Sequence, residues 1–542
     1  MGVVAPTVVD ASSENRVTTS QSAGAGGAAR GARPTIGFVS LGCPKNLVDS
    51  EVMMGLLDRA GGELTARAED AEILVVNTCS FIDSAKQESV NTILEMVQHK
   101  VANGGKARRL IVAGCLVERY RDEIRKNIPE VDAVVGTGEL EAILEAAGLS
   151  APVAQATAAG SPFNILVSRA PSAVHQHSHP TEVGAQLEVA KAASSSRAEG
   201  DARERQGRFS REHWDGATAA LPEYLYSDET PRILTTPRAS AYIKIAEGCD
   251  HPCSFCIIPQ LRGKFRSRRL ESIVAEAEKL IARGVREITL IGQDTTCWGE
   301  DLGLKDGLAT LLDALAVLPG LKWLRFLYAY PNKVTTRLLE TMARHENIAK
   351  YLDVPLQHAS PSVLKRMKRG GTPEVFLRLI EKARAVVPGI VLRTSFIVGF
   401  PGETEEDFQQ LCDFVAAAKI DWLGVFSYSD EEGAAAFELD SALKVPKRTI
   451  EARRRRLMKL QQKISKKAKS EWVAREVDVL VEGESEETEL LWQGRTALHA
   501  PEIDGKVLIN DFGPHETLVP GTFYRAEITE SHEYDVVARI IE

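Results

Sequence analysis

The sequence has no long apolar run, no excess of positive charge and few cysteines for its length. No stretch reaches the roughly 18 apolar residues that a membrane-spanning helix needs, and no basic segment followed by an apolar one marks a signal peptide. We therefore expect a cytoplasmic protein with no membrane partner. The net charge of −9 gives no overall nucleic-acid-binding pattern. Eight cysteines in 542 residues are too few for a secreted disulfide framework.

Three of these cysteines nevertheless lie within eight residues. Cys249, Cys253 and Cys256 have the spacing C-x3-C-x2-C and follow an apolar segment, 241–246, that is typical of a strand. A four-iron cluster normally takes four cysteine ligands, so three on one loop would leave one iron open to a small chelating molecule. Zinc is an alternative, because short cysteine spacings also suit zinc. A further alternative is that the three cysteines are buried, unrelated to one another and bind no metal.

A second set of cysteines is spread over the N-terminal part of the chain. Cys43, Cys79 and Cys115 lie 36 residues apart, and each follows a predicted strand. These strands are expected at 35–41, 73–78 and 110–113, with a fourth at 132–135. Right-handed crossovers place the carboxyl ends of such strands at one edge of a parallel sheet, where ligands bind. The pattern predicts a second metal site, again one ligand short; the alternative is three thiols that merely pack well at strand ends.

The alternation of strands and helices predicts an α/β protein with three ordered domains. In residues 34–148 this alternation predicts a parallel α/β sheet domain. In residues 235–465 it predicts a partial (β/α)6 barrel with the functional site at the carboxyl ends of the strands. Its six strands are expected at 241–246, 287–291, 323–328, 351–354, 391–398 and 423–426. Residues 466–542 alternate apolar and polar residues in short strands, as a small β-barrel does.

The other segments carry little periodicity. Residues 1–33 and 149–234 are rich in small and polar residues, and we expect a disordered tail and a flexible insert. Alternating histidines in the insert are more typical of such a linker than of a metal site; they are His175, His177 and His179. Residues 447–470 form a basic helix that we expect to be a solvated connector. Two isolated cysteines, Cys297 and Cys412, are interpreted as packing residues.

The two cysteine sets resemble those of methylthiotransferases, a family of radical S-adenosylmethionine (SAM) enzymes. Residues 34–148 are similar to their N-terminal domain, 235–465 to their radical SAM core, and the last segment to their TRAM domain. The resemblance implies a 4Fe–4S cluster on each cysteine set, with SAM on the open iron of the cluster held by Cys249, Cys253 and Cys256. It further implies a set of SAM contacts: Phe255, Gln293, Gln357, Arg393 and Gly399.

Two branches of this family differ in substrate. One modifies an adenosine of transfer RNA, and the other modifies the β-carbon of an aspartate in small-subunit ribosomal protein twelve. Three segments look like the ribosomal-protein branch: 40–46, 246–253 and 355–361. A non-catalytic alternative is an iron–sulfur carrier or scaffold, although a carrier needs no second site.

The resemblance also implies a mechanism with two SAM molecules. One methylates a sulfur at the Cys43, Cys79 and Cys115 cluster. The other yields a 5′-deoxyadenosyl radical, which removes a hydrogen from the aspartate before the methylthio group is transferred. We expect a monomer that receives electrons from a flavodoxin or ferredoxin.

The charge of the C-terminal segment bears on the substrate independently. Residues 471–542 carry 5 basic and 17 acidic side chains, a net charge of −12. An RNA-binding barrel would offer lysine and arginine to phosphates, whereas an acidic barrel attracts a basic ribosomal protein. Five glutamates in a short run are expected to steer that partner: Glu482, Glu484, Glu486, Glu487 and Glu489.

Overall fold

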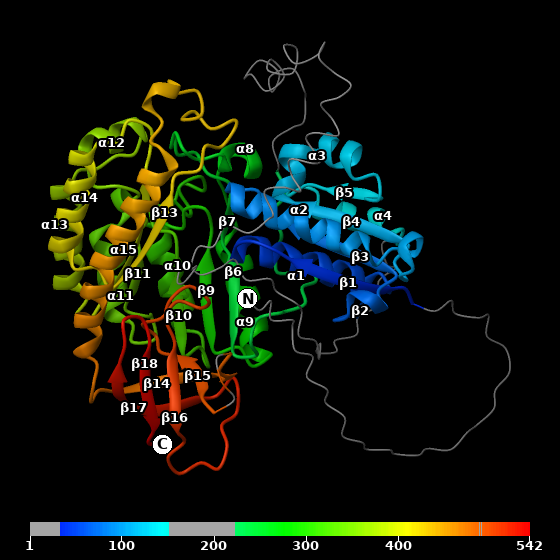
Figure 1. Cartoon of the computed structure of the whole chain (residues 1–542). Helices are drawn as coiled ribbons and strands as arrows, with labels where there is room; N and C mark the ends of the chain where they lie inside the picture. The colour runs from blue at the N-terminus through cyan, green and yellow to red at the C-terminus, as the bar shows by residue number, and fades with distance from the viewer. Residues whose placement is uncertain (1–32, 151–222, 487, 489) are drawn as a thin grey trace. The chain divides into compact units, whose positions relative to one another are not determined.

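The computed structural model describes residues 33–150, 223–486, 488 and 490–542. The expectations for the tail and for most of the insert, including its three histidines, therefore lie outside the described residues. The chain divides into a unit of residues Met1–Arg33 and a unit of residues Pro34–Glu542. The second unit contains an N-terminal sheet, a partial barrel and a C-terminal barrel (Figure 1).

The N-terminal sheet is parallel throughout, in the order β2-β1-β3-β4-β5. Its strands are β1 (Thr35–Ser40), β2 (Glu63–Thr65), β3 (Ile73–Thr78), β4 (Arg109–Gly114) and β5 (Ala133–Val135). Every residue of β3 is buried, because alternate side chains face helices on both sides of the sheet. This explains why the central strands are continuous apolar runs in the sequence. The sequence did not indicate β2, because this three-residue edge strand has no apolar run.

Helices cover both faces of this sheet. They are α1 (Pro44–Arg59), α2 (Asp83–Val97), α3 (Cys115–Asn127) and α4 (Ile143–Ala147), with 3-10 turns η1 (Ala68–Asp70), η2 (Val101–Asn103) and η3 (Leu140–Ala142). Apolar side chains of α1 and α4 pack on one face, and those of α2 and α3 pack on the other. The carboxyl ends of the strands therefore form one open edge between the helix layers.

The partial barrel consists of two parallel three-stranded sheets, β10-β9-β6 and β11-β12-β13. An isolated parallel bridge between Leu324 and Ile348 joins them at β10. The six strands are β6 (Ser240–Lys244), β9 (Glu287–Ile291), β10 (Trp323–Phe326), β11 (Tyr351–Asp353), β12 (Val391–Val398) and β13 (Trp422–Ser427). All six predicted strands are present. A short antiparallel pair that the sequence did not indicate, β7 (Ala246–Glu247) and β8 (Arg266–Ser267), flanks the cysteine loop.

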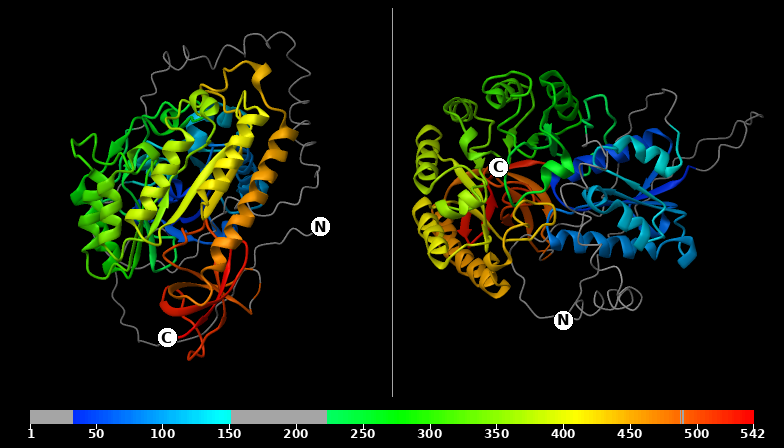
Figure 2. Two further views of the ribbon diagram at one scale, coloured as in Figure 1. Left: turned by 90° about the vertical axis from the view of Figure 1, so that its left-hand side faces the viewer. Right: turned by 90° about the horizontal axis from the view of Figure 1, so that it is seen from above.

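Helices surround the outside of the partial barrel (Figures 1 and 2). They are α9 (Leu270–Ala282), α10 (Gly307–Ala316), α11 (Thr336–Arg344), α12 (Pro361–Arg366), α13 (Pro373–Val386) and α14 (Glu405–Ala418), with turns η4 (Pro331–Lys333) and η5 (Ser441–Leu443). The short α8 (Ile258–Arg262) lies instead at the cysteine loop, where Leu261 packs with Cys115. One large apolar core lies between these helices and the strands. Thr404 and Asp407 close a capping box at the start of α14, which fixes the loop that leaves β12.

The basic helix α15 (Lys447–Ser470) is more than a solvated connector, and that expectation is corrected. One face packs along β13, with Ile450 and Leu457 in the main apolar core (Figure 2). Arg453 is buried and donates to the Glu403 carboxylate at 2.9 Å. The arginine-rich sequence concealed this contact, because long basic side chains can bury their stems while their charges are paired.

The C-terminal barrel is closed, in the order β14-β15-β16-β18-β17. Its strands are β14 (Glu476–Glu484), β15 (Trp492–Arg495), β16 (Val507–Asp511), β17 (Phe523–Ser531) and β18 (Val536–Ile540). It contacts the partial barrel at the amino ends of the strands. There, Glu287 at the start of β9 accepts hydrogen bonds from Arg495 and pairs with Arg325 at 3.3 Å. The C-terminal barrel thus closes the floor of the partial barrel, opposite the strand ends that carry the cysteine loops.

Candidate functional site

The first cysteine set lies on three loops at the carboxyl edge of the N-terminal sheet. Cys43 precedes α1, Cys79 follows β3, and Cys115 is the first residue of α3. All three thiols are free, and Cys79 and Cys115 are buried. Gly42 has a φ of +94°, and a Cβ atom there would lie 2.8 Å from the Cβ of Cys79. Only glycine allows the first loop to approach the second this closely.

The second set, Cys249, Cys253 and Cys256, lies on the loop between β7 and α8. Gly248 opens this loop with a φ of +81°, and a Cβ atom there would lie 2.1 Å from a carbonyl oxygen of the returning chain. Ser254, in the middle of the loop, donates from its N–H and its hydroxyl to two carbonyls at the end of α12, at 3.0 and 2.8 Å. The loop is therefore held in place by the Gly248 turn and by hydrogen bonds from Ser254, and not by the thiols alone.

Burial disfavours free thiolates in both sets. Burial, together with the nearby Cys115 and Cys43, raises the pKa of Cys79 to about 12. Burial also raises the pKa of Cys256 to about 12 and that of Cys249 to about 11. These thiols are protonated at neutral pH unless a bound metal replaces the proton.

The spacing of the sulfur atoms separates two kinds of metal site. Two sulfurs on one zinc ion are at most about 4.6 Å apart, because each Zn–S bond is about 2.3 Å long. In the part of the chain that the structure describes, neither cysteine set has all three sulfurs within 4.8 Å of one another. A multi-iron cluster, in which each sulfur binds a different iron, needs no such close approach of the three sulfurs.

A buried arginine contacts one sulfur in each set. Arg262 lies 3.4 Å from the Cys115 sulfur, and Arg369 lies 3.5 Å from the Cys253 sulfur. Their exposed fractions are only 2% and 9%. A guanidinium in contact with a thiolate offsets the negative charge of a thiolate-ligated cluster. The donors and their neighbours therefore fit an anionic iron–sulfur group at each set.

Four buried charges join the N-terminal sheet to the partial barrel. Asp49 of α1 pairs with Lys244 of β6 and with Arg262 of α8, the second at 2.7 Å. Lys244 also pairs with Glu247, which Arg262 approaches at 3.4 Å. Burial favours the neutral acid, but Lys244 and Arg262 hold the pKa of Glu247 at about 2. Because Arg262 also touches Cys115, and Glu247 lies directly before the loop of Cys249, this cluster links the loops of the two cysteine sets.

Three segments of the chain match known families. Residues 35–136 match the Uncharacterized protein family UPF0004, residues 243–415 match the Radical SAM superfamily, and residues 473–541 match the TRAM domain. Among curated relatives, the chain is 66% identical to the ribosomal protein uS12 methylthiotransferase RimO of Koribacter versatilis, over 93% of this chain and 96% of the relative. The RimO of Solibacter usitatus is 54% identical, over 93% of this chain and 94% of the relative. The chain belongs to the RimO family.

Family membership implies two 4Fe–4S clusters and SAM, and the two cysteine sets fit such clusters. Among solved structures, the chain is distantly similar to the radical SAM methyltransferase TsrM of Kitasatospora setae. That similarity has 17% identity and a TM-score of 0.44, over 73% of this chain and 75% of that one. Within the described residues, no helix is long and apolar enough to cross a membrane.

Four of the five expected SAM contacts lie on loops near the second cysteine set or at strand ends. Phe255 is in the cysteine loop and packs against the apolar cluster around α12. Gln293 follows β9, and its amide donates to a buried glutamate at 2.7 Å. Gln357 follows β11 with a φ of +73°, and the N–H of Gly399, after β12, donates to a buried carboxylate at 2.6 Å. Their role in binding SAM stays a prediction.

Arg393 differs from these four. It is the third residue of β12 and pairs with Asp353 at 2.8 Å and with Asp504 of the C-terminal barrel at 3.5 Å. Its guanidinium is therefore held toward the barrel floor by two carboxylates. The sequence could not indicate this, because Asp504 comes from another domain.

A polar cluster beside the second cysteine set was missed in the sequence. His251 lies 2.6 Å from an Asp294 carboxylate oxygen, and Cys297 donates to the same oxygen at 3.1 Å. The His251 ring stacks on Tyr330, with centroids 3.8 Å apart. Cys297, interpreted as a packing residue, is thus corrected to a hydrogen-bond donor, whereas Cys412 is buried in the apolar core. The position of Asp294, in the polar segment that follows β9, was the available signal.

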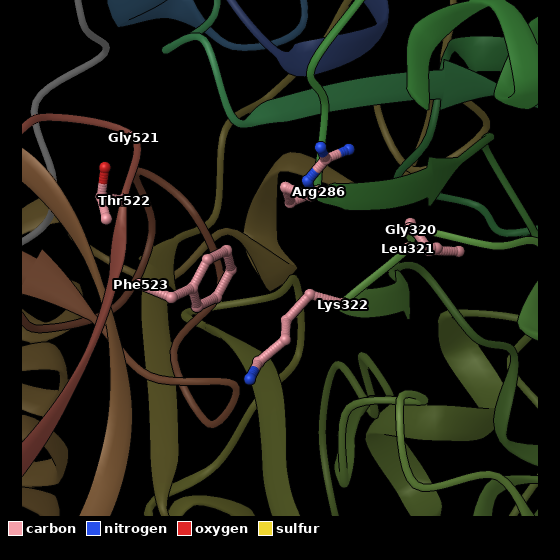
Figure 3. Close-up of a pocket in the computed structure, with 7 residues that line it drawn as sticks. All are labelled: Arg286, Gly320, Leu321, Lys322, Gly521, Thr522 and Phe523. Carbon is pink, nitrogen blue, oxygen red and sulfur yellow. The ribbon is translucent and has the colours of Figure 1, made fainter. Parts of the chain in front are cut away.

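A shallow cavity of about 460 Å³ lies at the other end of the partial barrel (Figure 3). It is formed where the starts of β9 and β10 meet β17 of the C-terminal barrel. Its lining is Arg286, Gly320, Leu321, Lys322, Gly521, Thr522 and Phe523. Because the cysteine loops leave the opposite strand ends, this cavity is not part of the candidate site.

Proposed function

We propose that this chain transfers a methylthio group to the β-carbon of an aspartate in ribosomal protein uS12. The observation that carries the proposal is a buried charge cluster that links the loops of the two cysteine sets, in a chain 66% identical to a protein named for that activity. In this proposal Cys43, Cys79 and Cys115 bind one cluster, and Cys249, Cys253 and Cys256 bind the other. When bound, the clusters and SAM supply reductive SAM cleavage and the sulfur that is transferred.

The protein's own part is to hold these groups in place and exclude water. Gly248 and Ser254 fix the second cysteine loop, and the buried pair of Asp49 and Arg262 fixes that loop against the first set. Burial around both sets keeps solvent from a reactive radical. We further infer a monomer that acts in the cytoplasm, where its ribosomal substrate is made, with electrons from a flavodoxin or ferredoxin.

The substrate assignment is tested by offering both family substrates to the reconstituted chain. We expect uS12, incubated anaerobically with the chain, SAM and a reductant, to gain about 46 Da at one aspartate, a methylthio group replacing hydrogen. Transfer RNA in the parallel reaction should stay unmodified. Intact-mass and peptide mass spectrometry measure the gain, and uS12 with that aspartate changed to alanine is the control. Modification of the RNA instead would contradict the assignment.

The structure revises the expected role of the acidic C-terminal barrel. Glu482 is half-buried and pairs with Arg495 at 2.6 Å, so we expect it to stabilise the barrel rather than to steer the substrate. Glu486 is exposed and lies 3.5 Å from Lys506. Glu487 and Glu489 lie outside the described residues. Because this barrel closes the floor, opposite the cysteine loops, we expect it to contact parts of uS12 remote from the modified aspartate.

Charge reversal on this barrel should therefore change substrate capture and not the chemical step. Replacing the exposed Glu484, Glu516 and Glu530 with lysine is expected to raise KM for uS12 several-fold at low salt, with kcat unchanged. The difference should vanish toward 1 M salt, where the screening length falls to about 3 Å. Steady-state kinetics at several salt concentrations measure both quantities.

A matched control changes the same total charge elsewhere. Glu340, Glu346 and Glu381 are exposed on the outer surface of the partial barrel. Their replacement with lysine should leave KM nearly unchanged. An equal effect of both triple variants, or a lower kcat in the first, would count against steering by the C-terminal barrel.

A further inference from the structure

Lys45 reaches from the N-terminal sheet to the mouth of the partial barrel. It is the second residue of α1, two positions after Cys43, and only 9% of it is exposed. Its ammonium lies 3.2 Å from the centroid of the Tyr328 ring. Because Tyr328 follows the carboxyl end of β10, the lysine side chain spans the space between the first cysteine set and the barrel mouth.

This ammonium differs from the other buried cations nearby. Lys244, Arg262 and Arg393 each form an ion pair with a carboxylate of the chain. In the described part of the chain, by contrast, no carboxylate oxygen lies within 4 Å of the Lys45 nitrogen. An aromatic ring compensates only part of the cost of burying an ammonium. The Cys43 thiol is the other close neighbour of this ammonium, so a carboxylate that pairs with Lys45 has to come from a ligand.

The Tyr328 platform is held rigidly in an unusual conformation. Its φ is +65°, in the left-handed region that non-glycine residues seldom adopt. Its N–H donates to the Asp353 carboxylate at 2.9 Å, and its carbonyl accepts from the Thr295 N–H at 3.2 Å. Backbone strain that is retained in this way is typical of residues with a functional position.

We propose that Lys45 binds the side-chain carboxylate of the aspartate that is modified. The inference rests on the proposed function. In that substrate the carboxylate is bonded directly to the β-carbon, so a cation that holds it also fixes the carbon that reacts. The carbon that reacts must lie near both the first cysteine set and the mouth of the partial barrel. Lys45 is suitably placed to hold it there, because its side chain lies between Cys43 and Tyr328.

The test removes the positive charge of Lys45 and, separately, the negative charge of the substrate aspartate. The reconstituted full chain and its Lys45→Met variant are each titrated, anaerobically and with SAM, against uS12 carrying either aspartate or asparagine at the modified position. We expect Lys45→Met to weaken binding of the aspartate form about ten- to hundredfold, as loss of a charged hydrogen bond does. It should leave binding of the asparagine form unchanged, and Lys45→Arg should restore most of the affinity. Lys126→Met, at an exposed position of α3, is the matched control.

Three results would overturn the proposal. One is an equal loss of affinity for the aspartate and asparagine forms. Another is a changed iron content or electron paramagnetic resonance spectrum of Lys45→Met, which would make Lys45 a counterion of the cluster. The third needs no variant: the unaltered chain would bind the asparagine form as tightly as the aspartate form. A failure of the unaltered chain to modify uS12 at all would instead reject the proposed function.

Discussion

Replacing Cys249, Cys253 and Cys256 together with alanine is expected to halve the iron content of the reconstituted chain, from about eight atoms to about four. The two cysteine sets lie on separate elements, and the backbone holds the loops of each set in place. Loss of one cluster should therefore leave the other in place. Iron and sulfide assays, with the visible absorption spectrum, measure the outcome after anaerobic reconstitution.

The mirror variant separates the roles of the two sets. Alanine at Cys43, Cys79 and Cys115 should also leave about four irons, and this variant should still cleave SAM while transferring no methylthio group. Cys412→Ala, outside both sets and in the apolar core, is the control and should keep about eight. Complete iron loss in either triple variant would show one shared site, and loss of SAM cleavage in the mirror variant would contradict the division of roles.

Replacing Glu287 with glutamine is expected to lower the free energy of unfolding by about 3–5 kcal/mol, as removal of one partner of a buried ion pair does. Glu287 and Arg325 are fully buried, and Arg495 of the C-terminal barrel is nearly so. The neutral amide would leave Arg325 without its carboxylate partner and Arg495 with Glu482 alone at the barrel floor. Urea unfolding followed by tryptophan fluorescence and circular dichroism measures the change. Glu340→Gln, on the surface of α11, should change it by no more than about 0.5 kcal/mol.

The same carboxylate gives the stability a defined pH dependence. Burial would raise the pKa of Glu287, but Arg495 and Arg325 lower it to about 2, from an ordinary value of 4.5. A group whose pKa is depressed by folding stabilises the native state above its unfolded pKa. This contribution should be complete above pH 4.5 and lost as the pH falls toward 2. Glu287→Gln should lack that part of the acid transition, and an unchanged acid transition would contradict the assignment.

The secondary structure of the site was largely predictable from the sequence, because buried parallel strands appear as continuous apolar runs. β3, β9 and β12 have the bounds that the sequence predicts. Short strands were not predicted, because β2 and β7 have only three and two residues and show no periodicity in the sequence. Cys297 and α15 were misinterpreted for a related reason: their partners, Asp294 and the core of the partial barrel, depend on the tertiary structure.

By itself the sequence predicted which residues would carry the chemistry, because soft thiol ligands stand out by type and spacing at the ends of predicted strands. Only the tertiary structure decided which charges meet. Arg262 is 213 positions from Asp49, and Arg495 is 208 positions from Glu287. No local pattern encodes such pairs, since any buried charge can be neutralised by whichever element packs against it. Lys45 shows the same limit: its motif is visible in the sequence, but only the tertiary structure places its ammonium over the Tyr328 ring.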